Sequence, residues 1–346
     1  MDGPRLIQSL DPTAALEHDV VPNDFHGIPF ERWLDMLCQF AMIFARNRNA
    51  AQCFTTLNTI LECNIFAFQE SAIQRSQLCR LACAIMLNDS KQVSHSVRWL
   101  LKRHPFCTDL YRLYNHANRL CTVGTDYSTS VMQKNMLRFI KAMDYTLMTP
   151  QQRIKMKFSS RNENITWEAK SLSRGNEKYI KSHDPVMLSL FGHILSSGGT
   201  YPSALNYYFR AFAVTPEDPI LNLSIAACYV QHSMKRLSEN RQYQLQQGLS
   251  FMMRYHQLRT KDNVAIRCQE AEYNIGRIWH TVGLNHLALP AYERCIALRE
   301  RVWKEANGEP VEDFATEAAY AMVTILSLSG DFKAAKEVTE EVLVIE

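Results

Sequence analysis

The sequence lacks the motifs that most enzymes and metal sites require. None of its ten cysteines forms a C-x-x-C pair, and the patterns G-x-x-x-x-G-K-[ST], G-x-G-x-x-G, H-E-x-x-H and G-x-S-x-G are all missing. Cys79 and Cys83 stand four residues apart near His95, but a metal ion would need two more converging ligands, so core packing is the favoured interpretation. We therefore expect no enzymatic activity and no cofactor.

Other features that the sequence lacks exclude further classes of protein. No apolar run reaches about 18 residues, so we expect no membrane span. The first residues lack a basic start followed by an apolar stretch, which argues against a signal peptide. The net charge of +3 is too small to indicate nucleic-acid binding by itself. Scattered cysteines at apolar positions are typical of reduced thiols in the cytosol or nucleus.

What the sequence does contain is helical periodicity along most of its length. Only twelve glycines and twelve prolines interrupt 346 residues, and strand-like alternation is scarce. The pattern predicts an all-α helical-repeat solenoid. Its parts are an irregular lead-in, repeat-like helices, a basic linker or insertion and a C-terminal array, at 1–28, 29–149, 150–184 and 185–346.

The stretch from Pro185 to Pro216 indicates which repeat this is. It reads as a helix, a tight turn and a second helix, with small and aromatic residues at fixed offsets. Those offsets match the 34-residue tetratricopeptide (TPR) pattern. Counting Pro185 as position 1, positions 8, 15, 20, 24, 27 and 32 are Gly192, Gly199, Ala204, Tyr208, Ala211 and Pro216.

Three further units follow. A second unit starts at Pro219, but its second helix arrives late because the insertion QHSMKRLSEN lengthens the turn. A third begins near Gln269, with Gly276 at position 8 and Tyr292 at position 24. A fourth, more degenerate unit begins near Thr316 and resembles a capping repeat.

Basic residues gather in two places. The segment 150–184 carries eight Lys or Arg against four Asp or Glu, and a second group lies around the insertion. A solvated loop is the simpler interpretation of such a run, and an arm that contacts nucleic acid or an acidic partner is the alternative. The candidate contact residues are Lys155, Lys157, Arg161, Lys235, Arg236 and Arg241.

A stack of such repeats offers a concave groove lined by the first helix of each unit. Positions 2, 5, 9 and 12 face this groove, and here they mix Tyr, Arg, His and small residues, which suits a peptide or helix of a partner. Ser189 occupies a position where co-chaperone adaptors carry Lys, which argues against that role. The candidate groove residues are His193, Tyr273, Arg277, His280 and Tyr320.

Several runs resemble one family closely. LNYYFRAFAVTPEDPILNLSIAACYVQHSMKRLSENRQYQLQQGLSFMMRYHQLR, QEAEYNIGRIWHTVGLNHLALPAYERCIAL and GIPFERWLDMLCQFAMIFARN are similar to the C-terminal TPR region of the tau subunit of transcription factor IIIC (TFIIIC). The insertion between the two helices of one repeat is the most specific mark, because ordinary TPRs lack it. Members of the family are much longer, so the resemblance implies that this chain is a fragment or a shortened copy.

The resemblance implies a role rather than a reaction. Members are nuclear, non-catalytic scaffolds that assemble TFIIIC on RNA polymerase III genes such as tRNA genes. They hold other TFIIIC subunits and support recruitment of TFIIIB through its Brf and Bdp subunits. We accordingly expect indirect or weak DNA contact, no membrane and no small-molecule substrate. The alternative is an unrelated TPR adaptor that binds a peptide or helix in another complex.

Overall fold

The computed structural model describes residues 24–67, 69–104, 106–121, 130–155, 181–235, 239–307 and 309–344. The chain divides into two compact units, Met1–Val123 and Gly124–Glu346. Most of the predicted lead-in at 1–28 lies outside the described residues. Its described part contains two strands of two residues each, β1 (Asp24–Phe25) and β2 (Ile28–Pro29), which pair antiparallel.

The first unit is built from helices joined by short turns. Asn49 and Asp89 cap two of these helices by accepting hydrogen bonds from backbone amides of the following turn. Leu34, Ala41 and Leu57 are buried where the first helices meet. The helices are α1 (Phe30–Arg46), α2 (Ala50–Glu62), α3 (Asn64–Ala67), α4 (Glu70–Met86), α5 (Ser90–Arg103) and α6 (Thr108–Cys121).

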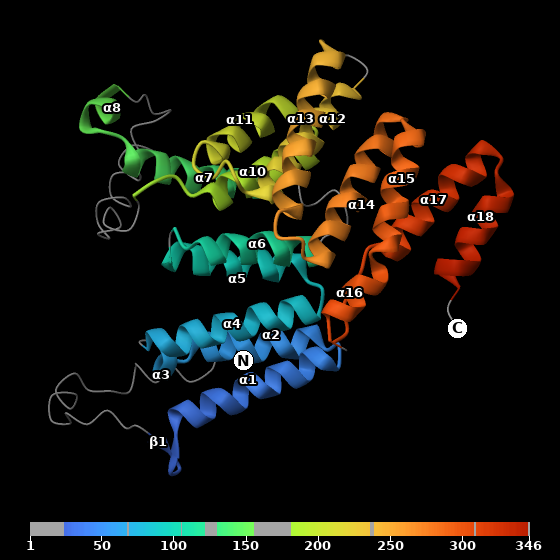
Figure 1. Ribbon diagram of the computed structural model, residues 1–346. Helices are drawn as coiled ribbons and strands as arrows, with labels where there is room; N and C mark the ends of the chain where they lie inside the picture. Colours follow the sequence, from blue (N-terminus) through green and yellow to red (C-terminus); the bar gives the residue numbers. More distant parts are fainter. Residues whose placement is uncertain are drawn as a thin grey trace, which may run out of the picture. The chain divides into compact units, whose positions relative to one another are not determined.

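The second unit is also helical, and most of its helices follow one another in sequential pairs (Figure 1). Asp184 and Asp218 cap the first helices of two pairs, with proline in the first turn of each. The helices are α7 (Ser130–Leu147), α8 (Pro150–Lys155), α10 (Pro185–Ser197), α11 (Tyr201–Phe212), α12 (Pro219–Ser233), α13 (Arg241–Thr260), α14 (Ala265–Val282), α15 (Asn285–Ala297), α16 (Arg299–Glu305), α17 (Ala315–Ser329), α18 (Phe332–Val338) and the π-helical turn η5 (Thr339–Leu343).

Packing within this unit follows the predicted repeat. The pairs α10–α11, α12–α13, α14–α15 and α17–α18 each pack together. Each pair then contacts the next through α11–α12, α13–α14 and α15–α17. This order of contacts is that of a TPR array, in which each repeat covers the apolar face of its neighbour. The predicted all-α, TPR-type fold is confirmed.

Two glycines explain how closely the paired helices approach. A Cβ atom added to Gly192 would lie 2.4 Å from the ring of Tyr208, and one added to Gly276 would lie 2.7 Å from the ring of Tyr292. Both tyrosines are buried. In these two repeats, position 8 must therefore lack a side chain because the aromatic residue at position 24 occupies that space.

The structure differs from the sequence prediction beside the basic segment. Residues Pro150–Lys155, predicted as part of a linker, form the short helix α8. Thr149 and Gln152 form a capping box, in which the Gln152 amide donates to Thr149 Oγ1 and the Thr149 amide donates to Gln152 Oε1. Thr149-Pro150 therefore ends one helix and starts another. Residues 156–180 lie outside the described residues, so the extent of the linker stays a prediction.

Two helix assignments also shift. The sequence grouped α7 with the first helical half, but α7 packs on α10 within the second unit. The second helix of the third repeat is divided at Leu298 into α15 and α16. The late second helix of the second repeat starts at Arg241, as predicted from the insertion.

Candidate functional site

A cavity of about 450 Å³ opens on the second unit between α14, α15, α17 and η5. Its volume falls in the range of about 300–1,000 Å³ that is typical of ligand pockets. We call it the α14–α17 pocket. It is lined by Tyr273, Arg277, His280 and Thr281 of α14, Tyr292 of α15, Thr316, Glu317, Tyr320 and Ala321 of α17, and Leu343 of η5.

Tyr292 anchors the base of this pocket. Its ring packs against Gly276 and is 1% exposed. Burial raises the pKa of Tyr292 to about 12, so its hydroxyl stays protonated at neutral pH and can donate a hydrogen bond. The ring of His280 meets that of Tyr292 edge-on, with centroids 6.4 Å apart.

Arg277 is held in place by an aromatic ring rather than by an acid. Its guanidinium carbon lies 5.7 Å from the centroid of the Tyr273 ring, which itself stacks against Phe314 at 5.4 Å. A guanidinium over an aromatic face gains cation–π attraction and keeps its donors available. The rigid platform therefore positions Arg277 without consuming its hydrogen bonds.

The two charged residues of the pocket are both exposed and are not joined to each other. Among the described residues, neither Arg277 nor Glu317 forms an ion pair with a protein group. Tyr320 projects beside them with 69% of its surface exposed. The pocket thus presents a cation, an anion and tyrosine hydroxyls to a ligand.

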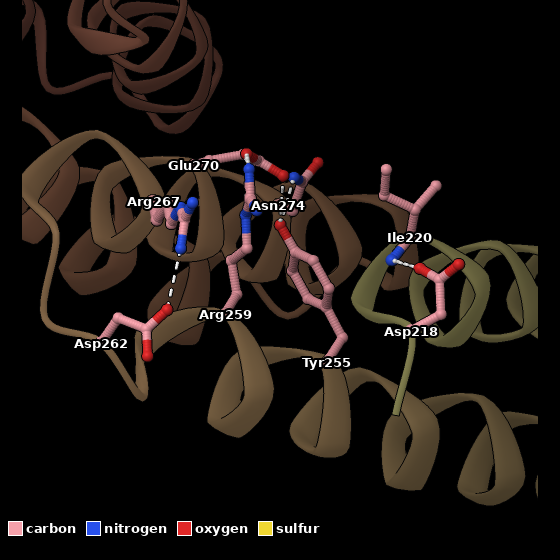
Figure 2. A network of polar contacts seen from close by, with 8 residues as sticks. All are labelled: Asp218, Ile220, Tyr255, Arg259, Asp262, Arg267, Glu270 and Asn274. Carbon is pink, nitrogen blue, oxygen red and sulfur yellow. Dashed lines mark hydrogen bonds and ion pairs between the residues drawn. The ribbon is translucent and has the colours of Figure 1, made fainter. Parts of the chain in front are cut away.

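A polar network ties the preceding helices together next to this site (Figure 2). Tyr255 Oη donates to Glu270 Oε1 at 2.9 Å and accepts from Asn274 Nδ2 at 3.0 Å, while Arg259 Nε donates to Glu270 Oε2 at 3.0 Å. Burial is the main cause that raises the pKa of Tyr255 above its ordinary value, and the Glu270 carboxylate adds to it. Glu270 is satisfied within the protein, so it is not available to a partner.

Four of the five predicted groove residues come together in the α14–α17 pocket, namely Tyr273, Arg277, His280 and Tyr320. The fifth, His193, lies on α10, where its Nε2 is 2.9 Å from Ser224 Oγ. The residues predicted from the sequence did not include Tyr292, Glu317 or four further residues that line the pocket. Glu317 stands at position 2 of the fourth repeat, which is a groove-facing position, whereas Tyr292 stands at position 24, which is not. Leu343 arrives from the end of η5, which no sequence pattern indicated.

Of the predicted basic contact residues, Lys235 and Arg241 are neighbours, whereas Lys155 lies on a different helix. Lys235 lies at the turn after α12, with its ammonium 4.7 Å from the Tyr201 ring centroid, and it donates to the Gly199 carbonyl. Arg241 donates to the Lys235 carbonyl at 3.3 Å. Lys155 is exposed at the end of α8. Lys157, Arg161 and Arg236 lie outside the described residues, so a basic contact surface stays a prediction.

The described part of the chain contains neither a metal-binding cluster nor a membrane-spanning helix. No group of three His, Cys, Asp or Glu side chains is arranged there to hold a metal ion. None of the helices described there is both long enough and apolar enough to cross a membrane.

The sequence has relatives among characterised proteins. It is 30% identical over 332 residues to transcription factor tau subunit sfc4 of Schizosaccharomyces pombe, covering 92% of this chain and 31% of that protein. It is 24% identical over 349 residues to the transcription factor tau 131 kDa subunit of Saccharomyces cerevisiae, covering 99% of this chain and 31% of that protein. This chain is a homologue of the tau subunits of TFIIIC. The predicted resemblance is confirmed.

A human relative extends the relationship beyond fungi. General transcription factor 3C polypeptide 3 of Homo sapiens is 30% identical over 142 residues, covering 41% of this chain and 15% of that protein. The chain spans about a third of the length of its two yeast relatives.

No protein-family model matches the chain. Among solved structures, the apo form of RapI covers 89% of this chain and 75% of its own, with a TM-score of 0.39 and 10% identity. The C-terminal part of a TPR repeat-containing protein from Cytophaga hutchinsonii covers 79% of this chain and 100% of its own, with a TM-score of 0.28 and 13% identity.

Proposed function

We propose that this chain is a scaffold region of TFIIIC that holds other subunits of the complex on RNA polymerase III promoters, such as those of tRNA genes. Homology to the tau subunit of Schizosaccharomyces pombe over 92% of the chain supports this role. The role is nuclear, because it is exerted at RNA polymerase III promoters. It is non-catalytic, because it consists of joining proteins rather than converting a substrate.

The observation that carries the proposal is the α14–α17 pocket. It combines an exposed tyrosine, a pre-positioned arginine and an acid on the first helices of two successive repeats. Tyr and Arg are the residues that most often dominate binding energy at protein interfaces. A repeat array gains its binding surface from such first helices, so a segment of a neighbouring subunit is the natural occupant.

A decisive experiment compares two exposed aromatic residues of the same repeat. Tyr320 and Phe332 are 69% and 70% exposed, but only Tyr320 lines the pocket. Full-length protein carrying Tyr320→Ala or Phe332→Ala would be affinity-purified, and the co-purifying TFIIIC subunits would be quantified by mass spectrometry. We expect Tyr320→Ala to reduce the recovery of at least one subunit severalfold and Phe332→Ala to leave it unchanged. Absence of every TFIIIC subunit from the unmutated sample would contradict the proposed function.

Recruitment of TFIIIB is a separate part of the proposal. We favour assembly within TFIIIC over direct capture of TFIIIB for this region, and TFIIIB recruitment is then supported indirectly by the assembled complex. Pull-downs of this chain with each TFIIIC and TFIIIB subunit would test the division. Binding to the Brf or Bdp subunits, with no binding to a TFIIIC subunit, would reverse it.

A further inference from the structure

The α14–α17 pocket contains an arginine whose surroundings differ from those of most neighbouring arginines. Between α13 and α16, five arginines have a carboxylate partner, whereas Arg277 has none among the described residues. Arg241 and Arg254 also lack one, but neither lines the pocket. The paired arginines are Arg259, Arg267, Arg294, Arg299 and Arg301.

The groups around Arg277 are mostly hydrogen-bond donors. The Tyr273 and Tyr292 side chains line the same cavity, and burial raises the pKa of both hydroxyls, so both stay protonated at neutral pH. The N–H groups of a guanidinium and the O–H groups of neighbouring tyrosines are donors, and the two oxygens of a carboxylate can accept hydrogen bonds from them.

Glu317 limits how much negative charge a ligand of the pocket can carry. It lies in the same lining as Arg277, and its negative charge opposes a second strongly negative group. A phosphate would bring a charge of about −1.5 to −2 against a single arginine. A carboxylate brings one charge, which Arg277 alone can balance. Glu317 can then accept a backbone N–H from the same ligand.

The remaining wall is suited to an apolar side chain. Tyr320, Ala321 and Leu343 line the part of the pocket formed by α17 and η5. An extended peptide advances about 3.3 Å per residue, so neighbouring residues reach both parts of a cavity of this size.

Resting on the proposed assembly role, we propose that the α14–α17 pocket recognises a segment of a partner subunit that carries an Asp or Glu next to, or one residue away from, a large apolar residue. The acidic side chain binds Arg277, and the apolar side chain packs on Tyr320 and Leu343. The partner is therefore selected by an acidic–apolar pair in an exposed, extended stretch.

A peptide library tests this preference directly. The 346-residue chain would be applied to immobilised hexapeptides with blocked ends, varied at every position, and the selected peptides would be measured by isothermal titration. We expect selection of Asp or Glu beside Leu, Ile, Phe or Met, and at least tenfold weaker binding when the acid is replaced by its amide. No preference for an acidic residue would overturn the proposal.

Two charge-reversal variants separate the pocket from general electrostatics. Arg277→Glu and Lys333→Glu make the same change in net charge, but Lys333 is an exposed residue of α18 outside the pocket. We expect Arg277→Glu to weaken binding at least tenfold and to prefer a peptide with Lys in place of the acid, while Lys333→Glu stays within twofold. Equal effects of the two variants would also overturn the proposal. Arg277→Gln serves if Arg277→Glu lowers the melting temperature.

The library and the co-purification experiment can fail independently. If TFIIIC subunits co-purify but the library shows no acidic preference, the pocket preference is wrong and the assembly role stands. If the acidic preference is found but no TFIIIC subunit co-purifies, the proposed assembly role is wrong.

Discussion

The repeats α10–α11 and α14–α15 share their internal packing but differ in the groove. In both, a glycine on the first helix meets a buried tyrosine on the second, Gly192 with Tyr208 and Gly276 with Tyr292. The residue that follows each glycine faces the groove, and there the two repeats differ. His193 lies within hydrogen-bond distance of Ser224, whereas Arg277 has no carboxylate partner among the described residues.

This difference shows that the packing of a repeat and the chemistry of its groove are set by different positions. Positions 8 and 24 determine how closely two helices approach. Position 9 faces the next first helix, where Ser224 satisfies His193 in one case and the pocket opens beside Arg277 in the other. A repeat can therefore keep its fold while its groove gains or loses a binding site.

The largest expected effect tests the shared packing. Ala204 and Ala288, at the same position of the two repeats, are fully buried. Ala204→Arg or Ala288→Arg would place a charge without a partner in the interior, which should lower the free energy of unfolding by roughly 3–5 kcal/mol. Chemical denaturation of each variant measures this. An unchanged melting curve for either would contradict the assigned repeat register.

The glycine contacts should come next in size. In Gly276→Leu the added side chain would overlap the Tyr292 ring, and in Gly192→Leu it would overlap the Tyr208 ring. We expect a loss of about 3 kcal/mol from overpacking, and a smaller loss for the corresponding alanine variants. Gly283→Leu is not a suitable control, because its backbone is left-handed. Ser197→Leu, on a partly exposed position near the end of α10, is the matched one.

Removing one hydroxyl tests how firmly α14 is held against α13. Tyr255→Phe would delete the hydrogen bonds to Glu270 and Asn274 shown in Figure 2, with little change in packing. We expect a loss of about 1–2 kcal/mol, because a buried polar network is left incomplete. Thermal unfolding measures it, with Tyr243→Phe, an exposed tyrosine of α13, as the control.

The third repeat should also contain a residue, Glu272 of α14, whose contribution to stability depends on pH. Burial alone would raise the pKa of Glu272, but the hydrogen bond from His256 and the Arg294 guanidinium outweigh it and lower the pKa. A lowered folded-state pKa stabilises the fold above the ordinary value near 4.5, and this stabilisation is lost as pH falls through the folded-state value. Unfolding free energies measured from pH 6 to pH 3 should therefore fall less steeply for Glu272→Gln. Parallel curves would contradict this.

The smallest effect on stability should come from exchanging the groove residue itself. Arg277→His gives the third repeat the residue that the first repeat carries at that position, and Arg277 is exposed. We expect a change within about 0.5 kcal/mol in the free energy of unfolding, as for most surface substitutions. Acidic peptides should nevertheless bind more weakly. A large loss of stability would mean that Arg277 is part of the packing rather than of the groove.

Much of the fold could be predicted from the sequence. For example, the turn-forming residues Asn88 and Asp89 separate α4 (Glu70–Met86) from α5 (Ser90–Arg103), as their residue types indicate. Helical periodicity and turn residues are local signals, so they carry such boundaries to within one or two residues. These local signals did not predict the helix that begins at Pro150, because Thr149 and Pro150 both end one helix and begin another.

The candidate site was only partly predictable. Repeat positions placed Tyr273, Arg277, His280 and Tyr320 on groove-facing helices, and the structure gathers them in one cavity. The same positions also included His193, which lies within hydrogen-bond distance of Ser224. Position 2 of the third repeat is Glu270, which is hydrogen-bonded within the Tyr255 network. Periodicity says which side chains face a groove, but it does not say which polar groups find a partner there.

The sequence by itself determined the repeat and its register, because small and aromatic residues at fixed offsets dictate how each helix pair closes. It also determined the relationship to the tau subunits of TFIIIC. Only the tertiary structure decided that, among the described residues, Arg277 and Glu317 form no ion pair while Arg259 and Glu270 bind each other. That outcome depends on distances between helices that are far apart in the chain, which no local pattern encodes.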